Sequence, residues 1–259
     1  MNKHPFHLVD ASPWPFTSSL GSLFLVSGLA AYVHRYGSLL FCLGLFLVLF
    51  SAAQWWRDVT REATFQGKHS HKVESGMRMG MLLFICSEVF FFLAFFWAFF
   101  HAALSPNVEV GGVWPPVGIV AIPPFDIPLL NTAVLLSSGA TITWAHMSLL
   151  KGSWLETQFS LYCTVLLGLY FSMLQLMEYR YAEFSMSDGV YGSTFYVATG
   201  FHGLHVVIGT LFISVAAYRN YCFHFTASHH FGFEASAWYW HFVDVVWLFL
   251  FLTIYWWGF

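Results

Sequence analysis

The sequence predicts an all-α membrane protein with seven transmembrane helices. Only 9% of its 259 residues are charged and 58% are apolar, whereas roughly a quarter of the residues in an ordinary soluble domain are charged. So few charged side chains cannot cover the surface of a soluble protein of this size. The composition therefore excludes a soluble enzyme, a disordered chain and a secreted disulfide scaffold.

Long stretches without Asp, Glu, Lys or Arg locate the membrane spans. A helix needs about 20 apolar residues to cross a hydrocarbon layer about 30 Å thick. Five charge-free stretches are long enough, and two more qualify if each contains one intramembrane acid, Glu88 or Asp244. In chain order the predicted spans are 11–34, 36–56, 79–104, 127–150, 157–177, 189–218 and 235–257.

The segments between the spans support this division. All nine prolines lie in the first fifteen residues or in segment 106–128, away from helix interiors, where proline would remove a backbone hydrogen bond. Segment 106–128 is predicted to be a rigid loop that packs against another part of the protein. The connection 57–78 is the longest charged one, and we place a two-helix unit in residues 1–70 and a five-helix unit in residues 71–259.

The basic residues predict the orientation, because Lys and Arg accumulate in inner loops. With the N-terminus inside, eight basic residues lie on the inner side, and only Arg35 and Arg180 lie outside. The first fifteen residues resemble neither a secretory signal nor a transit peptide. We therefore expect either insertion in a bacterium or synthesis inside an organelle. The eight inner residues are Lys3, Arg57, Arg61, Lys68, Lys72, Arg78, Lys151 and Arg219.

The composition argues against several ligands. A net charge of −3 gives no basic surface for nucleic acid, and the four cysteines are too far apart in sequence for a thiolate cluster. Most of the thirteen histidines, including His229 and His230, fall in loops or at span ends, where solvated or lipid-facing side chains are usual. No compact metal-ligand motif occurs, so we predict no metal site.

Glu88 is the one charged residue within the third predicted span. It lies ten residues beyond Arg78, about 15 Å along a helix and so near the bilayer midplane. An ionised, unpaired carboxylate is costly there, so Glu88 is expected to be protonated or hydrogen-bonded. It either handles protons and contacts a partner helix, or joins two helices through a neutral hydrogen bond.

Four other polar residues are predicted at a similar depth and suggest a polar layer with Glu88. His202 and His205 lie three residues apart in the sixth span, and His241 and Asp244 have the same spacing in the seventh. A hydrogen-bonded structural layer is the commoner outcome of such a pattern. The alternatives are haem ligation, for which the histidine spacing is poor, and a channel or transporter that uses Glu88 and Asp244.

Paired tryptophans and arginines mark the inner end of the second span. Trp55 and Trp56 precede Arg57 and Arg61. Tryptophan lies at headgroup level and arginine binds phosphate with two nitrogens, so an anionic lipid site is one interpretation. The other is an ordinary positive-inside anchor.

Longer strings make the sequence similar to a known family. It resembles the subunit III family of haem–copper cytochrome c oxidases from end to end. The strings include QWWRDVTREATFQG at 54–67, SEVFFFLAFFWAFFHAALSP at 87–106, GGVWPPVGI at 111–119 and SDGVYGSTFYVATGFHGLHVVIGT at 187–210. SPWP at 12–15, PLLNTAVLLSSGATITWAH at 128–146 and HHFGFEASAWYWHFVDVVWLFLFLTIYWWG at 229–258 complete them.

The resemblance implies a non-catalytic core subunit with two-helix and five-helix bundles around a lipid-filled cleft. Haem a and copper would belong to the partner subunits I and II, further accessory subunits would surround the chain, and phospholipids would bind to it. The resemblance also implies a role in proton uptake by subunit I and in preventing inactivation during turnover. Among the residues of this sequence it implies Glu88 as the membrane carboxylate, and Trp55, Trp56, Arg57, Arg61, His69, Arg219, His224 and Thr226 as the lipid-binding set.

The implied location is the mitochondrial inner membrane, with the N-terminus in the matrix and the C-terminus in the intermembrane space, or else a bacterial plasma membrane. Two positions depart from the family pattern. Met147 stands where relatives often have a second histidine, and Asn220 follows Arg219 where relatives often have a basic residue. The second departure predicts weaker headgroup contacts at that loop.

Overall fold

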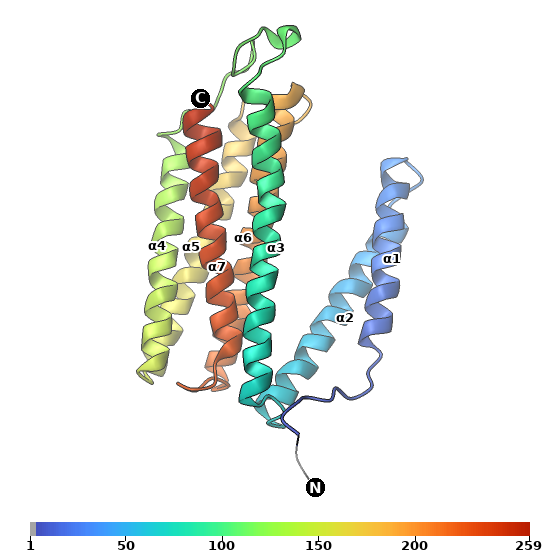
Figure 1. Ribbon diagram of the computed structural model, residues 1–259, viewed down its shortest axis with the longest axis vertical. Coiled ribbons are helices and arrows are strands. Elements are labelled where there is room, and N and C mark those ends of the chain that lie inside the picture. The colour runs from blue at the N-terminus through green and yellow to red at the C-terminus, as the bar shows by residue number, and fades with distance from the viewer. Residues whose placement is uncertain (1–3) are drawn as a thin grey trace. The chain divides into compact units, whose positions relative to one another are not determined.

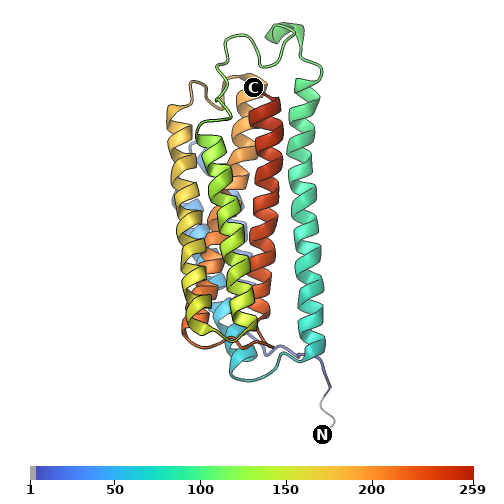
Figure 2. The same ribbon diagram turned by 90° about the vertical axis from the view of Figure 1, so that its left-hand side faces the viewer.

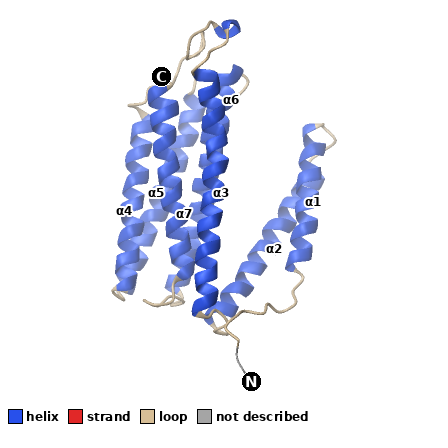
Figure 3. Ribbon diagram, viewed as in Figure 1, coloured by secondary structure: helices blue, strands red, loops and turns tan. Residues whose placement is uncertain are grey.

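The computed structural model describes residues 4–259, and the ordered elements of those residues are all helical (Figures 1 and 3). Seven helices are long and apolar enough to cross a membrane, which confirms the predicted fold class. Lys3, used in the orientation count, lies outside the described residues. The helices are α1 (Trp14–Val33), α2 (Leu39–Thr64), α3 (His71–Ala103), α4 (Ile127–Leu150), α5 (Trp154–Tyr181), α6 (Gly189–Tyr221) and α7 (Phe231–Leu250). A 3-10 turn η1 (Val108–Val110) lies in the long loop, and a π-helical segment η2 (Phe251–Trp257) continues α7.

Several helices continue beyond their predicted spans. Helix α2 runs to Thr64 and α3 begins at His71, so the connection between them is 65–70 and the prediction of a loop over 57–78 is wrong. The length of a charge-free stretch reflects the thickness of the hydrocarbon layer. A helix can continue beyond it into the headgroup region, where charged side chains are solvated. Arg57 and Arg61 therefore lie on the last turns of a helix and not in a loop.

The chain divides into two compact units, one ending at Met77 and the other formed by Arg78–Phe259. This boundary falls within the first two turns of α3, and the division into residues 1–70 and 71–259 stays a prediction. The predicted lipid-filled cleft stays a prediction.

In the first unit, α1 and α2 pack closely along two glycines. A Cβ on Gly28 would lie 2.3 Å from the backbone nitrogen of Phe41, and a Cβ on Gly44 would lie 2.3 Å from that of Leu25. Such contacts leave no room for any side chain. Small residues at these positions are how membrane helices gain packing contacts when lipid is as apolar as the partner helix.

Polar contacts fix the ends of this unit. The indole nitrogen of Trp14 donates to Asp58 Oδ2 at 2.6 Å, which joins the start of α1 to the last turns of α2. Asp10 precedes α1 and Lys68 follows α2. Lys68 Nζ lies 2.5 Å from Asp10 Oδ2. This hydrogen bond and the positive charge of Lys68 lower the pKa of Asp10, so the contact is an ion pair at neutral pH.

In the second unit, α4 to α7 pack in chain order, and α4 also contacts α7 (Figure 2). Two tryptophans of α7 fill the space between the helices. Trp240 and Trp247 are 0% and 1% exposed, and their indole nitrogens donate at 2.9 Å to Ser138 Oγ and Thr132 Oγ1 of α4. Each therefore combines a large apolar contact with one satisfied polar group.

Helix α3 and the long loop complete the second unit. Phe92 and Phe99 of α3 are buried in its core. In the loop, the ring of Trp114 lies 5.4 Å from that of Phe99 and 5.4 Å from that of Tyr191. The loop thus packs onto the helices, as its aromatic content predicts. Pro128 lies in the first turn of α4, where the missing N–H is harmless.

Candidate functional site

Glu88 of α3 and His205 of α6 form a polar pair among apolar helices. Their atoms Oε2 and Nε2 are 2.9 Å apart, and the two side chains are 21% and 10% exposed. The other ring nitrogen of His205 lies 2.7 Å from the carbonyl oxygen of Phe201. A carbonyl only accepts, so Nδ1 carries a proton and Nε2 of a neutral His205 is an acceptor.

This arrangement lets the pair hold one further proton in two ways. The proton lies on Glu88, which then donates to a neutral His205, or on His205, which then forms an ion pair with a carboxylate. Both states satisfy the facing atoms, because a carboxylic acid and an imidazolium are donors. The chemistry supports either a structural clamp or proton exchange, the two interpretations left open by the sequence.

Aromatic rings surround the pair. The ring of Phe92 lies 5.0 Å from that of His205, and the rings of Tyr239 and Phe242 lie 6.2 and 6.4 Å from it. These side chains keep water away from His205 and lower the local dielectric. An unpaired polar group would therefore be costly at this position.

His202 is separate from the pair although it lies one turn earlier on α6. It is 1% exposed, and its Nε2 lies 3.2 Å from the carbonyl oxygen of Val243. Its ring packs against those of Phe171 and Trp247 at 5.6 and 5.2 Å. His202 therefore joins α6 to α7 inside the core, and its Nδ1 has no hydrogen-bond partner in the described part of the chain.

His241 and Asp244 lie between α7 and α4. Asp244 Oδ2 is 3.9 Å from His241 Nδ1, and Thr143 Oγ1 is 3.5 Å from His241 Nε2. A Cβ on Gly139 would lie 2.7 Å from Asp244 Oδ2, so that glycine provides the space for the carboxylate. These residues line an open pocket on this face, and in the described part of the chain no hydrogen bond connects them with Glu88 and His205. The five residues of the predicted layer therefore lie in three separate places: the Glu88–His205 pair, His202 alone, and His241 with Asp244.

The sequence analysis missed a polar network near the C-terminal end of α5. Glu178 Oε1 accepts from Tyr255 Oη at 2.5 Å and from Gln175 Nε2 at 2.9 Å, and Gln175 Oε1 accepts from Asn131 at 3.2 Å. Glu178 is 2% exposed. Ending the fifth span at residue 177 placed Glu178 in a loop, although the spacing of Gln175 and Glu178 puts both on one helical face.

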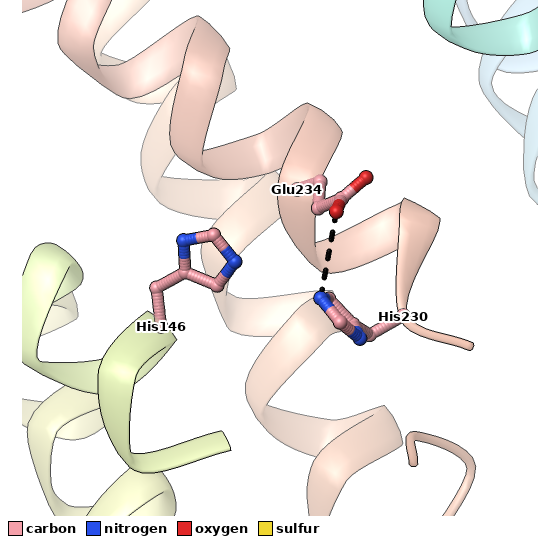
Figure 4. A group of neighbouring side chains, drawn as sticks. All are labelled: His146, His230 and Glu234. Atoms are coloured by element: carbon pink, nitrogen blue, oxygen red, sulfur yellow. Dashed lines mark ion pairs between the residues drawn. The ribbon is translucent and has the colours of Figure 1, made fainter. Parts of the chain in front are cut away.

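A second missed group is formed by His146, His230 and Glu234 at the end of α4 and the start of α7 (Figure 4). His230 is 6% exposed, so the expectation of a solvated or lipid-facing side chain is wrong for this residue. It is buried because the rings of His146 and Phe233 pack against it at 5.6 and 6.5 Å.

The predicted lipid-binding residues of the first unit lie near the end of α2. Trp56 is 71% exposed and Trp55 is 37% exposed. Arg57 is exposed and pairs with Asp58 at 3.1 Å, and Arg61 is exposed on the next turn. His69 lies in the connection that follows, with its ring 5.4 Å from that of His7.

The predicted lipid-binding residues of the second unit have mainly internal contacts. The guanidinium of Arg219 lies 4.6 Å from the centre of the Phe225 ring, and its Nε has no hydrogen-bond partner. Burial, together with the charge of Arg219, lowers the pKa of His224. Thr226 Oγ1 accepts from the backbone N–H of His229 at 3.1 Å. Because a lowered pKa leaves His224 neutral at pH 7, the positive charge at the end of α6 comes from Arg219.

Comparison with known proteins decides between the interpretations. A family model described as cytochrome c oxidase subunit III matches residues 4–259. Proteins named cytochrome c oxidase subunit 3 from Aedes aegypti and Formosania lacustris are each 60% identical over 255 residues, covering 98% of this chain and 97% and 98% of theirs. A protein of the same name from Danio rerio is 59% identical over 255 residues, with 98% of both chains covered.

The chain belongs to the cytochrome c oxidase subunit III family. Membership confirms the resemblance noted in the sequence and favours an oxidase subunit over an independent transporter or a haem protein. The structure agrees with this choice at the two central histidines, because His202 bonds to backbone and His205 to Glu88.

Proposed function

We propose that this subunit III family member is a non-catalytic core subunit of cytochrome c oxidase. The complex is an oxidoreductase that transfers electrons from cytochrome c to oxygen and pumps protons. Haem a and copper lie in partner subunits I and II, and this chain stabilises subunit I, its proton uptake and bound phospholipids. The observation that carries the proposal is the family match over residues 4–259 together with relatives about 60% identical.

The proposed location is the mitochondrial inner membrane, with the N-terminus in the matrix and the C-terminus in the intermembrane space. The support is the distribution of basic residues, eight on the inner side against Arg35 and Arg180 on the outer side. Inner loops of membrane proteins are rich in Lys and Arg. Tagging each terminus and digesting from one side of the membrane tests this orientation.

The Glu88–His205 pair is proposed to hold the α3–α6 contact in place while the oxidase turns over. Depleting this chain from the purified complex should leave the initial turnover and the haem spectrum nearly unchanged. It should also shorten the period before activity is lost. If the depleted complex remains active as long as the intact one, the proposed stabilising role is wrong.

Phospholipid binding is proposed for Arg57 and Arg61, which are exposed beside Trp55 and Trp56 at the end of α2. An Arg near an anionic surface contributes about 1 kcal/mol, so the double variant Arg57→Ala/Arg61→Ala should lower the affinity for anionic phospholipid about thirtyfold. The measurement is the anionic lipid that co-purifies, determined by mass spectrometry. Arg180→Ala removes an exposed arginine from the last turn of α5 and is the control. Equal lipid content in all three samples would remove the assignment.

A further inference from the structure

We propose that His146, His230 and Glu234 form a binding site for one divalent cation of the zinc class. The three residues meet at the end of α4 and the start of α7 (Figure 4). One ligand atom from each lies within 4.8 Å of the other two. Two imidazoles and one carboxylate, with a fourth position left for water, are a common ligand set for Zn²⁺.

The distances suit a zinc ion after a small side-chain movement. Bonds of about 2.0–2.1 Å in a tetrahedral site place neighbouring ligand atoms about 3.3 Å apart. His230 Nε2 and Glu234 Oε1 are already 3.5 Å apart. His146, which is half-buried on α4, must move closer by up to about 1.5 Å to complete such a site, a shift within the reach of side-chain rotation.

The surroundings of His230 direct an unprotonated nitrogen into the group. Its Nδ1 lies 2.9 Å from the carbonyl oxygen of Thr226, so Nδ1 donates and Nε2 carries the lone pair. That Nε2 is buried without a hydrogen-bond partner among residues 4–259, in a side chain that is 5% exposed. Leaving a buried acceptor unpaired is unfavourable, and a cation bound to Nε2 removes this cost.

The turn that carries His230 is held by further hydrogen bonds. The N–H of His229 donates to Thr226 Oγ1 at 3.1 Å, and the N–H of Thr226 donates to the carbonyl of His229 at 3.2 Å. A backbone carbonyl that orients the second ring nitrogen of a ligating histidine is the usual support of a protein metal site. The position of His230 is therefore set before any ion arrives.

Glu234 is oriented in the same way. Arg78 Nε donates to its Oε2 at 2.9 Å, and its Oε1 faces His230. Because Arg78 occupies one oxygen, Glu234 would bind the cation through Oε1 alone. The charge of Arg78 also offsets part of the carboxylate charge, so the two neutral imidazoles contribute most of the selectivity for zinc over magnesium, which prefers oxygen ligands.

The alternative is a simple packing cluster, in which His146 contacts its neighbours only through its ring. Its ring lies 5.6 Å from that of His230 and 5.5 Å from that of Phe233. No hydrogen bond to either ring nitrogen of His146 occurs among the described residues, so packing alone leaves both ring nitrogens of His146 and Nε2 of His230 without a hydrogen bond. Zinc binding by both histidines distinguishes the two explanations.

The test measures zinc directly in the full chain, purified in mild detergent with the partners that accompany it. After dialysis against a chelator, the protein is equilibrated with radioactive Zn²⁺ in the presence of excess Mg²⁺. The wild type should bind one zinc ion more per chain than His230→Ala or His146→Gln. His34→Gln, which removes an exposed histidine from the loop between α1 and α2, should bind as much as the wild type.

Two further readouts keep the test decisive. The side chain of His146 makes no hydrogen bond to the described residues, so His146→Gln should assemble normally, and unchanged co-purification of its partners checks this. The difference in zinc X-ray absorption between wild type and His146→Gln should show only nitrogen and oxygen ligands at about 2.0–2.1 Å. Equal zinc in the wild type and both site variants, or an equal loss in His34→Gln, would overturn the proposal.

Discussion

Replacing His205 with Leu should destabilise the protein by about 1–3 kcal/mol, because removing one member of a largely buried, hydrogen-bonded pair leaves the other without a partner. Glu88 makes its hydrogen bond to His205 Nε2 at 2.9 Å, in a ring of aromatic side chains. Glu88→Gln should cost much less, since an amide N–H still donates to an imidazole nitrogen. The double variant Glu88→Leu/His205→Leu should be more stable than His205→Leu alone, because it leaves no carboxyl group unpaired.

The order of stability of these variants is measured by thermal denaturation of the purified protein. It is also measured by how long activity lasts during turnover. His241→Leu is the matched control, because His241 is also an intramembrane histidine close to an acid, here Asp244, but its side chain is 46% exposed. It should have the smallest effect. Equal stability of His205→Leu and His241→Leu would show that the pair contributes nothing to stability.

Trp247→Ala should have the second large effect, with a loss of about 3 kcal/mol or more. Trp247 is 1% exposed, its indole nitrogen donates to Thr132 Oγ1 at 2.9 Å, and its ring lies 4.9 Å from that of Phe171. Lipid is as apolar as the core, so the loss comes from the cavity and the broken hydrogen bond and not from exposure to water.

The comparison variant is Trp97→Ala on α3. Trp97 is 74% exposed within the chain, and a substitution that leaves no cavity usually changes stability by less than about 0.5 kcal/mol. Denaturation in detergent, followed by circular dichroism, gives both values. A similar loss for the two tryptophans would contradict the packing described for α7.

The sequence predicted the membrane spans well because charge-free length is a direct consequence of the bilayer. It predicted their ends poorly. Thr64 and His71 lie inside charged sequence yet belong to α2 and α3, and Glu178 was assigned to a loop although it is buried in α5. Helices continue into the headgroup region, where hydropathy no longer limits them.

The sequence predicted how deep the residues of the candidate site lie in the membrane, but not which neighbouring helix each side chain faces. Residue counting placed Glu88, His205 and Asp244 at similar levels of the membrane. Which of them meet depends on how each helix is rotated about its axis, and packing between neighbouring helices decides that. Asp244 lies against Gly139 of α4, where the absence of a side chain makes room for it. The i, i+3 spacing of His241 and Asp244 does not show that Asp244 packs against α4.

The histidine–glutamate group shows the same limit. His230 and Glu234 have the i, i+4 spacing that brings side chains together at the start of a helix, so part of the group was visible in the sequence. His146 comes from α4 and reaches them only through the packing of α4 on α7. No local pattern connects residues so far apart in the chain.

The measurement that tests the central claim most directly is purification through a tag on this chain in mild detergent. A reduced-minus-oxidised spectrum is recorded before and after the partner subunits are stripped away. A non-catalytic oxidase subunit should arrive with a haem a signal carried by larger subunits, and the signal should leave with them. Haem that remains on the isolated chain, or a chain that purifies without any haem protein, would contradict the account.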